Sequence, residues 1–139
     1  MAKSGRYSAD RKKIQLLTNA VTYDAIVADC GTIFTATGAS GTTKINLLPA
    51  AKAGNGWWCK VIKTGAAGAG GTIVAEAHAD DGNNAIKGIN VDGTIDLINH
   101  DVITIADGAD PGVQFELVCD GTTYYILGHA VTNGDIAGS

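Results

Sequence analysis

The sequence predicts an all-β domain: an antiparallel β-sandwich or a barrel-like, jelly-roll-like sandwich with an extended N-terminal arm. Apolar and polar residues alternate with a period of two in short segments, and clusters of Gly, Asp and Asn separate these segments. This pattern is typical of half-buried strands joined by turns. About ten such segments follow one another at intervals of roughly 8–12 residues, a spacing typical of sandwiches and barrels.

The elements can be assigned in chain order. Residues 1–13 show no alternation and are predicted to form an arm outside a single β domain of residues 14–139, whose first expected strand is Ile14–Thr18. Further strands are expected at Thr32–Thr35, Lys44–Leu48, Trp57–Lys63, Thr72–Ala75, Ala85–Ile89, Thr94–Leu97 and Val102–Ile105.

The segments between these strands are expected to be short and polar. Pro49–Ala53 is expected to form one helical turn, because proline suits the first helical position and glycine follows at Gly54. Gly65–Gly71 is expected to be a flexible loop, and Gly134–Ser139 a loose tail.

The clearest hairpin lies near the C-terminus. Val113, Phe115, Leu117 and Cys119 alternate with polar residues and are expected to face the core. Asp120-Gly121 is expected to supply a two-residue turn, because glycine tolerates positive φ, and Thr122–Leu127 returns as the partner strand.

Length and composition favour one domain that associates with other molecules. The chain has 139 residues, 45% of them hydrophobic and only 17% charged, against about 25% charged in an average domain. A small domain of this kind is expected to expose apolar surface for self-association or docking. No apolar run is long enough for a membrane helix and no secretory signal is present, so cytoplasmic synthesis is expected.

The three cysteines show no pairing pattern. Cys30, Cys59 and Cys119 are widely spaced and odd in number, so no disulfide framework can use all of them. Each is expected to be a buried free thiol in or beside a strand, consistent with a reducing compartment.

The charge is divided unevenly between the arm and the body. The first thirteen residues carry five basic groups against Asp10, a net charge of +4, whereas the rest of the chain carries −8. A cationic arm on an acidic body predicts docking onto a negatively charged protein surface; nucleic acid is not expected, because the body would repel it. The arm residues assigned to this contact are Lys3, Arg6, Tyr7, Arg11, Lys12 and Lys13.

Signatures of catalysis are missing from the sequence. His78, His100 and His129 share no metal-ligand spacing, and Asp80–Asn84 lacks the ligand order of a calcium loop. Gly68–Gly71 leads into a strand rather than a helix, so it is not a phosphate loop, and there is no GxSxG motif. We therefore expect no enzyme, no catalytic residues, no metal and no cofactor.

Two aromatic pairs are candidate interface residues. Trp57-Trp58 and Tyr124-Tyr125 each place one ring on either face of a strand, so only one ring of each pair can enter the core. Trp58, Tyr124 and Tyr125 are the residues considered for an interface, with packing at a sheet edge as the alternative for the tryptophan.

Several motifs, taken in order, resemble small virion proteins of tailed bacteriophages, especially head decoration (cement) proteins and related β modules of phage head and tail fibres. They are Gly5-Arg6-Tyr7-Ser8-Ala9-Asp10-Arg11-Lys12-Lys13-Ile14, Ile45-Asn46-Leu47-Leu48-Pro49-Ala50-Ala51, Gly54-Asn55-Gly56-Trp57 and Asp120-Gly121-Thr122-Thr123-Tyr124-Tyr125-Ile126-Leu127. The resemblance implies a homotrimer on the capsid exterior that binds and stabilises the major capsid protein shell, with no membrane partner.

Two alternatives remain beside the decoration protein. One is a head- or tail-fibre module that binds a host receptor or a glycan, with Trp58 or the tyrosines as a sugar platform. The other is a minor hydrolase whose His and Asp residues are brought together by folding. The absence of a coiled-coil or collagen-like shaft favours a head decoration protein over a fibre tip.

Overall fold

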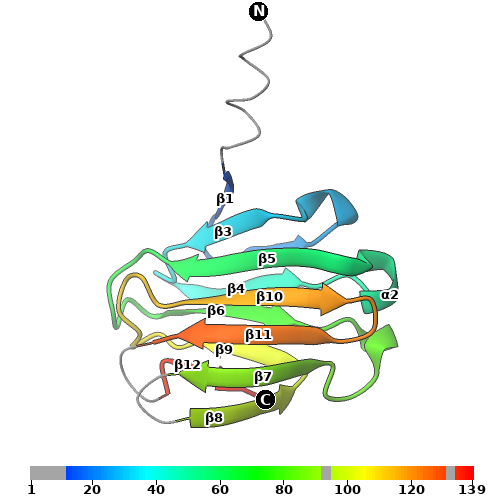
Figure 1. The fold of residues 1–139 in the computed structure, drawn as a ribbon. Coiled ribbons are helices and arrows are strands. Elements are labelled where there is room, and N and C mark those ends of the chain that lie inside the picture. Colours follow the sequence, from blue (N-terminus) through cyan, green and yellow to red (C-terminus); the bar gives the residue numbers. More distant parts are fainter. Residues whose placement is uncertain (1–11, 92–94, 131–133) are drawn as a thin grey trace, which may run out of the picture.

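The computed structural model describes residues 12–91, 95–130 and 134–139, and in them two β-sheets pack face to face (Figure 1). The larger sheet has seven strands in the order β1 (Lys13–Leu17), β3 (Thr32–Ala36), β5 (Asn55–Lys63), β10 (Gln114–Asp120), β11 (Tyr124–His129), β7 (Ile86–Val91) and β8 (Ile95–His100). The smaller has five, in the order β12 (Ile136–Gly138), β9 (Val102–Ile105), β6 (Gly71–Glu76), β4 (Gly41–Asn46) and β2 (Thr22–Asp24). The predicted all-β sandwich is confirmed.

The direction of strand pairing differs from the antiparallel expectation. The first six strands alternate between the sheets, so that β1, β3 and β5 pair in parallel in one sheet and β2, β4 and β6 pair in parallel in the other. Parallel neighbours need a crossover connection, and here a strand of the opposite sheet serves as each crossover. Antiparallel pairing dominates only later, as in β10 with β5 and β11.

The core lies between the two sheets and follows the predicted alternation. On β5, Trp57, Cys59 and Val61 are buried while Trp58, Lys60 and Ile62 are partly exposed, and on β10 the predicted inward residues are buried. Phe34 and Ile45 come from β3 and β4 and are also fully buried. Because successive side chains of a strand point to opposite faces, one alternating pattern is enough to assign the core side of each strand.

Among the described residues, three short helices connect strands. The predicted helical turn is confirmed as α2 (Ala50–Ala53) and ends at Gly54 with φ of 79°. Asp81, in the 3-10 helix η2 (Ala79–Asp81), accepts a hydrogen bond from the Ala50 N–H at 2.9 Å. The third, η1 (Val27–Asp29), follows β2 and lies beside β1. Asp81 therefore stabilises the start of α2 from a distant part of the chain.

The C-terminal part of the chain was predicted less well. The C-terminal segment forms β12, which pairs with β9, and Ser139 exchanges backbone hydrogen bonds with Val102 at 2.9 and 3.0 Å, so it is not a loose tail. Its three-residue strand is too short to show an alternating pattern. The predicted hairpin turn is shifted by one residue, with Gly121 and Thr122 between the paired Asp120 and Thr123.

Candidate protein-binding site at the arm junction

The edge strand β1 carries the most exposed large hydrophobic side chains of the described residues. Ile14 and Leu16 are 66% and 63% exposed and share one side of the strand. Lys13, Gln15 and Leu17 occupy the other side, where Leu17 enters the core. The alternation that normally buries one side of a strand thus leaves two aliphatic residues in solvent at the start of the described chain.

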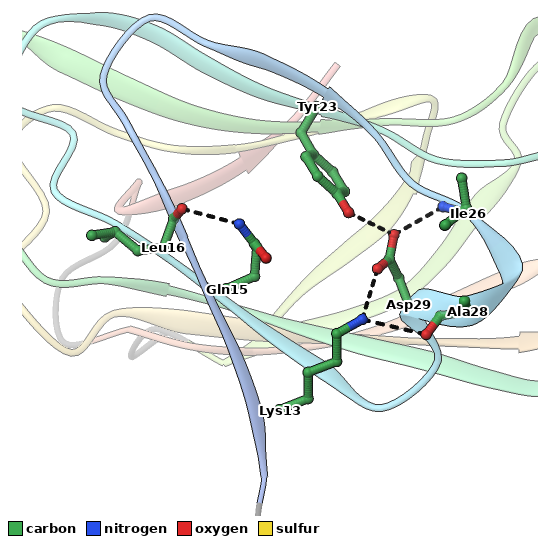
Figure 2. A network of polar contacts seen from close by, with 7 residues as sticks. All are labelled: Lys13, Gln15, Leu16, Tyr23, Ile26, Ala28 and Asp29. Atoms are coloured by element: carbon green, nitrogen blue, oxygen red, sulfur yellow. Dashed lines mark hydrogen bonds and ion pairs between the residues drawn. The ribbon is translucent and has the colours of Figure 1, made fainter.

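A buried carboxylate anchors the beginning of β1 (Figure 2). Asp29 Oδ1 lies 3.0 Å from Lys13 Nζ, while Asp29 Oδ2 accepts hydrogen bonds from the Tyr23 hydroxyl and the Ile26 N–H, each at 3.0 Å. Lys13 also donates to the Ala28 carbonyl at 3.4 Å. Since these groups come from β1, β2 and η1, one carboxylate joins three elements at this end of the sandwich.

The same contacts set the protonation of the two acids in the network. Burial opposes ionisation of Asp29, but hydrogen bonds from Ile26, Lys13 and Tyr23 outweigh it and lower the pKa of the carboxyl group. Burial, followed by the hydrogen bond to Asp29, raises the pKa of Tyr23. The network therefore holds an ionised carboxylate and a neutral phenol at neutral pH.

Lys12 lies against the predicted interface tryptophan. Its Nζ is 5.8 Å from the centroid of the Trp58 ring, within the range of a cation–π interaction. Gly31 lies beside the Trp58 ring, and its backbone N–H donates to the Trp58 carbonyl at 2.8 Å. Lys13 is thus fixed by an ion pair and Lys12 by an aromatic ring, just after the residues predicted to form the arm.

Outward side chains from four strands continue this apolar surface across the large sheet. Strand register aligns Trp58 with Val118 and Val118 with Tyr125, and it aligns Ile14 with Ile33. We call this surface the outer face; it comprises Ile14, Leu16, Ile33, Trp58, Val118, Tyr125 and Leu127. Lys60 and Glu116 cross its centre as an ion pair with 3.7 Å between Nζ and Oε2.

The predicted site residues other than Tyr124 divide into three groups. Lys3, Arg6, Tyr7 and Arg11 lie outside the described residues, so their contacts stay predictions. Lys12 and Lys13 lie at the arm junction, and Lys13 is the first residue of β1 rather than part of the arm. Trp58 and Tyr125 belong to the outer face.

Tyr124 must be removed from the predicted interface. Its side chain is fully buried, its hydroxyl donates to the Leu48 carbonyl at 2.7 Å, and its ring meets Trp57 edge-on with 6.0 Å between centroids. Burial raises the pKa of this phenol. Strand alternation puts Tyr124 inside and leaves Tyr125 outside, where a hydrogen bond to Asp120 raises its pKa.

Sequence reasoning missed several residues of the junction. Asp29 gave no signal because its partner Lys13 is sixteen positions away in no recognisable motif. Ile26 and Val27, both more than half exposed, stand outside any alternating segment. Their adjacency as two aliphatic residues was the sequence signal that could have indicated an exposed apolar site. Cys30, expected to be buried, is exposed because the chain turns there between η1 and β3.

A second surface feature is a groove of about 720 Å³ over the small sheet. Register aligns Asp24, Asn46 and Glu76 across the carboxyl ends of β2, β4 and β6. Asn46 Nδ2 donates to Asp24 Oδ1 at 2.6 Å, and Lys44 forms an ion pair with Glu76. Ile26, Val27 and Pro49 contribute apolar walls. The groove therefore combines ordered polar groups with aliphatic contacts.

The described residues hold neither a cluster of metal ligands nor a membrane-spanning helix. Within residues 12–91, 95–130 and 134–139, no three His, Cys, Asp or Glu side chains come together as a metal site. Among the same residues, no helix has the length and hydropathy needed to cross a bilayer. His78 instead accepts a hydrogen bond from the Asp80 N–H at 3.1 Å through Nδ1.

No protein-family model matches the chain, and no curated protein matches it.

Proposed function

We propose that this protein is a virion structural component, a capsid decoration protein that binds and stabilises the shell of the major capsid protein. The observation that carries the proposal is the junction itself, where a cationic arm joins the body beside an exposed apolar face. The arm is suited to acidic surface and the outer face to apolar surface on a partner. The resemblance of the sequence motifs to decoration proteins supports a capsid as that partner.

The two parts of the junction have complementary roles in this proposal. The arm supplies electrostatic attraction, which acts over about a Debye length and weakens as salt is added. The outer face supplies contact area, with Trp58 and Tyr125 as the aromatic residues that most often contribute strongly to protein interfaces. Many copies on one shell add modest single contacts into firm attachment.

Binding to undecorated capsids encoded by the same genome tests the proposal. The full chain is compared with a variant lacking residues 1–11, and with Lys52→Ala as a control for loss of an exposed body lysine. Cosedimentation is expected to disappear in the truncated variant and to persist in the control, with both unfolding temperatures near that of the parent. Undiminished binding without residues 1–11 would contradict the role of the arm.

The contribution of the outer face is separable from that of the arm. Val118→Lys introduces a charge beside Trp58, whereas Ala137→Lys places the same charge on an exposed site of the small sheet. We expect the first variant to bind capsids more weakly at every salt concentration and the second to bind normally. Equal binding by both variants would exclude the outer face as the contact.

The groove favours a second candidate function, a fibre module that binds a host glycan. Its row of Asp24, Asn46 and Glu76 offers hydrogen-bond acceptors to sugar hydroxyls, and Ile26 and Val27 offer apolar contact. A glycan array of host surface polysaccharides tests this candidate, with Asn46→Ala as the variant and Thr104→Ala as the control on the same sheet. Binding that is lost only in Asn46→Ala would support it.

A further inference from the structure

We infer that β1 is a self-association edge, on which a second copy of this chain pairs its own β1 in the antiparallel direction about Gln15. β1 is the terminal strand of the seven-stranded sheet and pairs with β3 on one side. Among the described residues, no strand pairs with its other side. An edge of this kind presents unpaired N–H and C=O groups to another strand.

The lysine charges that usually protect an edge strand from pairing are drawn toward the body at β1. Lysines on an edge strand normally discourage pairing with another chain. Here the Lys13 ammonium lies 3.0 Å from Asp29 Oδ1, and the Lys12 ammonium lies over the Trp58 ring. Both cations are therefore held by partners within the body. Apart from Lys13, the exposed residues of the strand are the aliphatic Ile14 and Leu16.

The side chains of β1 are self-complementary in one antiparallel register. Centring the pair on Gln15 places Ile14 opposite Leu16 of the second copy, and Leu16 opposite its Ile14. The four aliphatic side chains then form one cluster on the outer face, because all of them lie on the same side of the joined sheet. The central pair is Gln15 with Gln15, whose amides can donate and accept at the same time.

The same register avoids repulsion between like charges. Lys13 stands opposite Leu17 and Lys12 opposite Thr18, so no lysine faces a lysine across the pair. A contact of this type is isologous and closes after two copies, because each surface is occupied by its equivalent. The chemistry of the strand therefore favours a second copy over an unrelated strand.

Antiparallel pairing also places the two copies of residue 12 at opposite ends of the joined strands. A dimer would therefore present two basic arms to a capsid. This consequence rests on the proposed function, whereas the pairing of β1 does not depend on it. The resemblance to decoration proteins implies a trimer, while the geometry of β1 favours two chains. Solution mass separates these assemblies.

Light scattering on the eluting full-length chain is the first test, with a mass of two chains expected. Leu16→Lys places a charge opposite Ile14 of the second copy and is expected to give a monomer; the residue is exposed, so folding should be retained and is checked by circular dichroism. Val27→Lys is the control, because Val27 is similarly exposed but lies outside β1. A parent mass of one or three chains, or an unchanged dimer in Leu16→Lys, would overturn the inference.

Cross-linking tests the register independently of mass. In a Cys30→Ser background, Gln15→Cys places a thiol opposite its own copy and is expected to form a disulfide dimer rapidly on mild oxidation. Thr18→Cys is expected to cross-link more slowly, because in this register it faces Lys12. Faster cross-linking of Thr18→Cys would overturn the register. A parent protein that forms the dimer but does not bind capsids would count against the proposed function and leave the inferred pairing standing.

Discussion

The ammonium of Lys13 and the carboxylate of Asp29, 3.0 Å apart, join the edge of the large sheet to the 3-10 helix that follows β2. Lys13 is half exposed and Asp29 is almost fully buried. The carboxylate also accepts hydrogen bonds from Tyr23 and from the backbone of Ile26. A buried acceptor with three donors costs more to replace than an exposed ion pair, because each donor would lose its partner.

Asp29→Asn is expected to destabilise the fold by about 1–3 kcal/mol at neutral pH, because the amide cannot satisfy all three donors. The pKa of Asp29 is lowered in the folded state, so its ionised form contributes stability above the unfolded pKa of about 3.9. That contribution is lost as the pH falls through the lower folded value. Chemical unfolding at pH 7 and at pH 3 should therefore show a smaller gap between parent and variant in acid.

Asp110→Asn serves as the control for this measurement, because Asp110 is exposed and makes no described side-chain hydrogen bond. Its unfolding free energy should match that of the parent at both pH values. A gap for Asp29→Asn that is equal at pH 7 and pH 3 would show that the carboxylate charge is not what stabilises the junction.

Gly65→Ala is expected to cost about 1–3 kcal/mol, because the added methyl group cannot be accommodated without moving backbone. Its Cβ would lie 2.1 Å from the carbonyl oxygen of Thr37. Gly108→Ala meets no atom within 4 Å and requires no positive φ, so it should be neutral or stabilising by up to about 1 kcal/mol. Thermal unfolding of the two variants checks the contrast, and similar melting temperatures would contradict the close approach at Gly65.

The loop Gly65–Gly71, predicted to be flexible, is held by hydrogen bonds from other parts of the chain. Asp107 Oδ1 accepts hydrogen bonds from the N–H groups of Gly70 and Gly71 at 2.6 and 3.2 Å. The fully buried Lys63 donates to the Ala106 and Asp107 carbonyls. Composition predicted that the loop exists, but its attachment depends on residues about 40 positions away, which local sequence does not specify.

The difference between patterns within one segment and contacts between distant segments explains how much of the fold and of the site could be predicted. Alternation identifies strands and their buried faces, as it did for Trp57 and Phe115, because it is a property of each strand alone. It does not identify the neighbouring strand, so parallel pairing of β3 with β5 was missed. The prediction of a basic arm rests on charge composition alone, whereas the Lys13–Asp29 contact depends on how three elements meet.

Thr32→Val is expected to stabilise the protein by about 1 kcal/mol, because it replaces a buried hydroxyl without a partner among the described residues by an apolar group of similar size. Thr32 is fully buried, and its hydroxyl makes no hydrogen bond with the described residues. Thr43→Val is the matched control, since Thr43 is equally buried but donates to the Thr18 carbonyl at 3.4 Å. Urea unfolding should move the two midpoints apart, with Thr32→Val the higher; the reverse order would contradict the assignment.

The thiols provide a test of the sandwich as a whole. Cys30 is exposed, whereas Cys59 and Cys119 are buried between the sheets, and burial raises the pKa of both buried thiols. Because the thiolate is the reactive form, these two should remain unreactive until the sheets separate. An aromatic disulfide reagent at pH 8 should modify one thiol rapidly in the native protein and all three after denaturation. Cys30→Ser should abolish the rapid phase, and rapid modification of two or more native thiols would show that the sheets do not enclose Cys59 and Cys119.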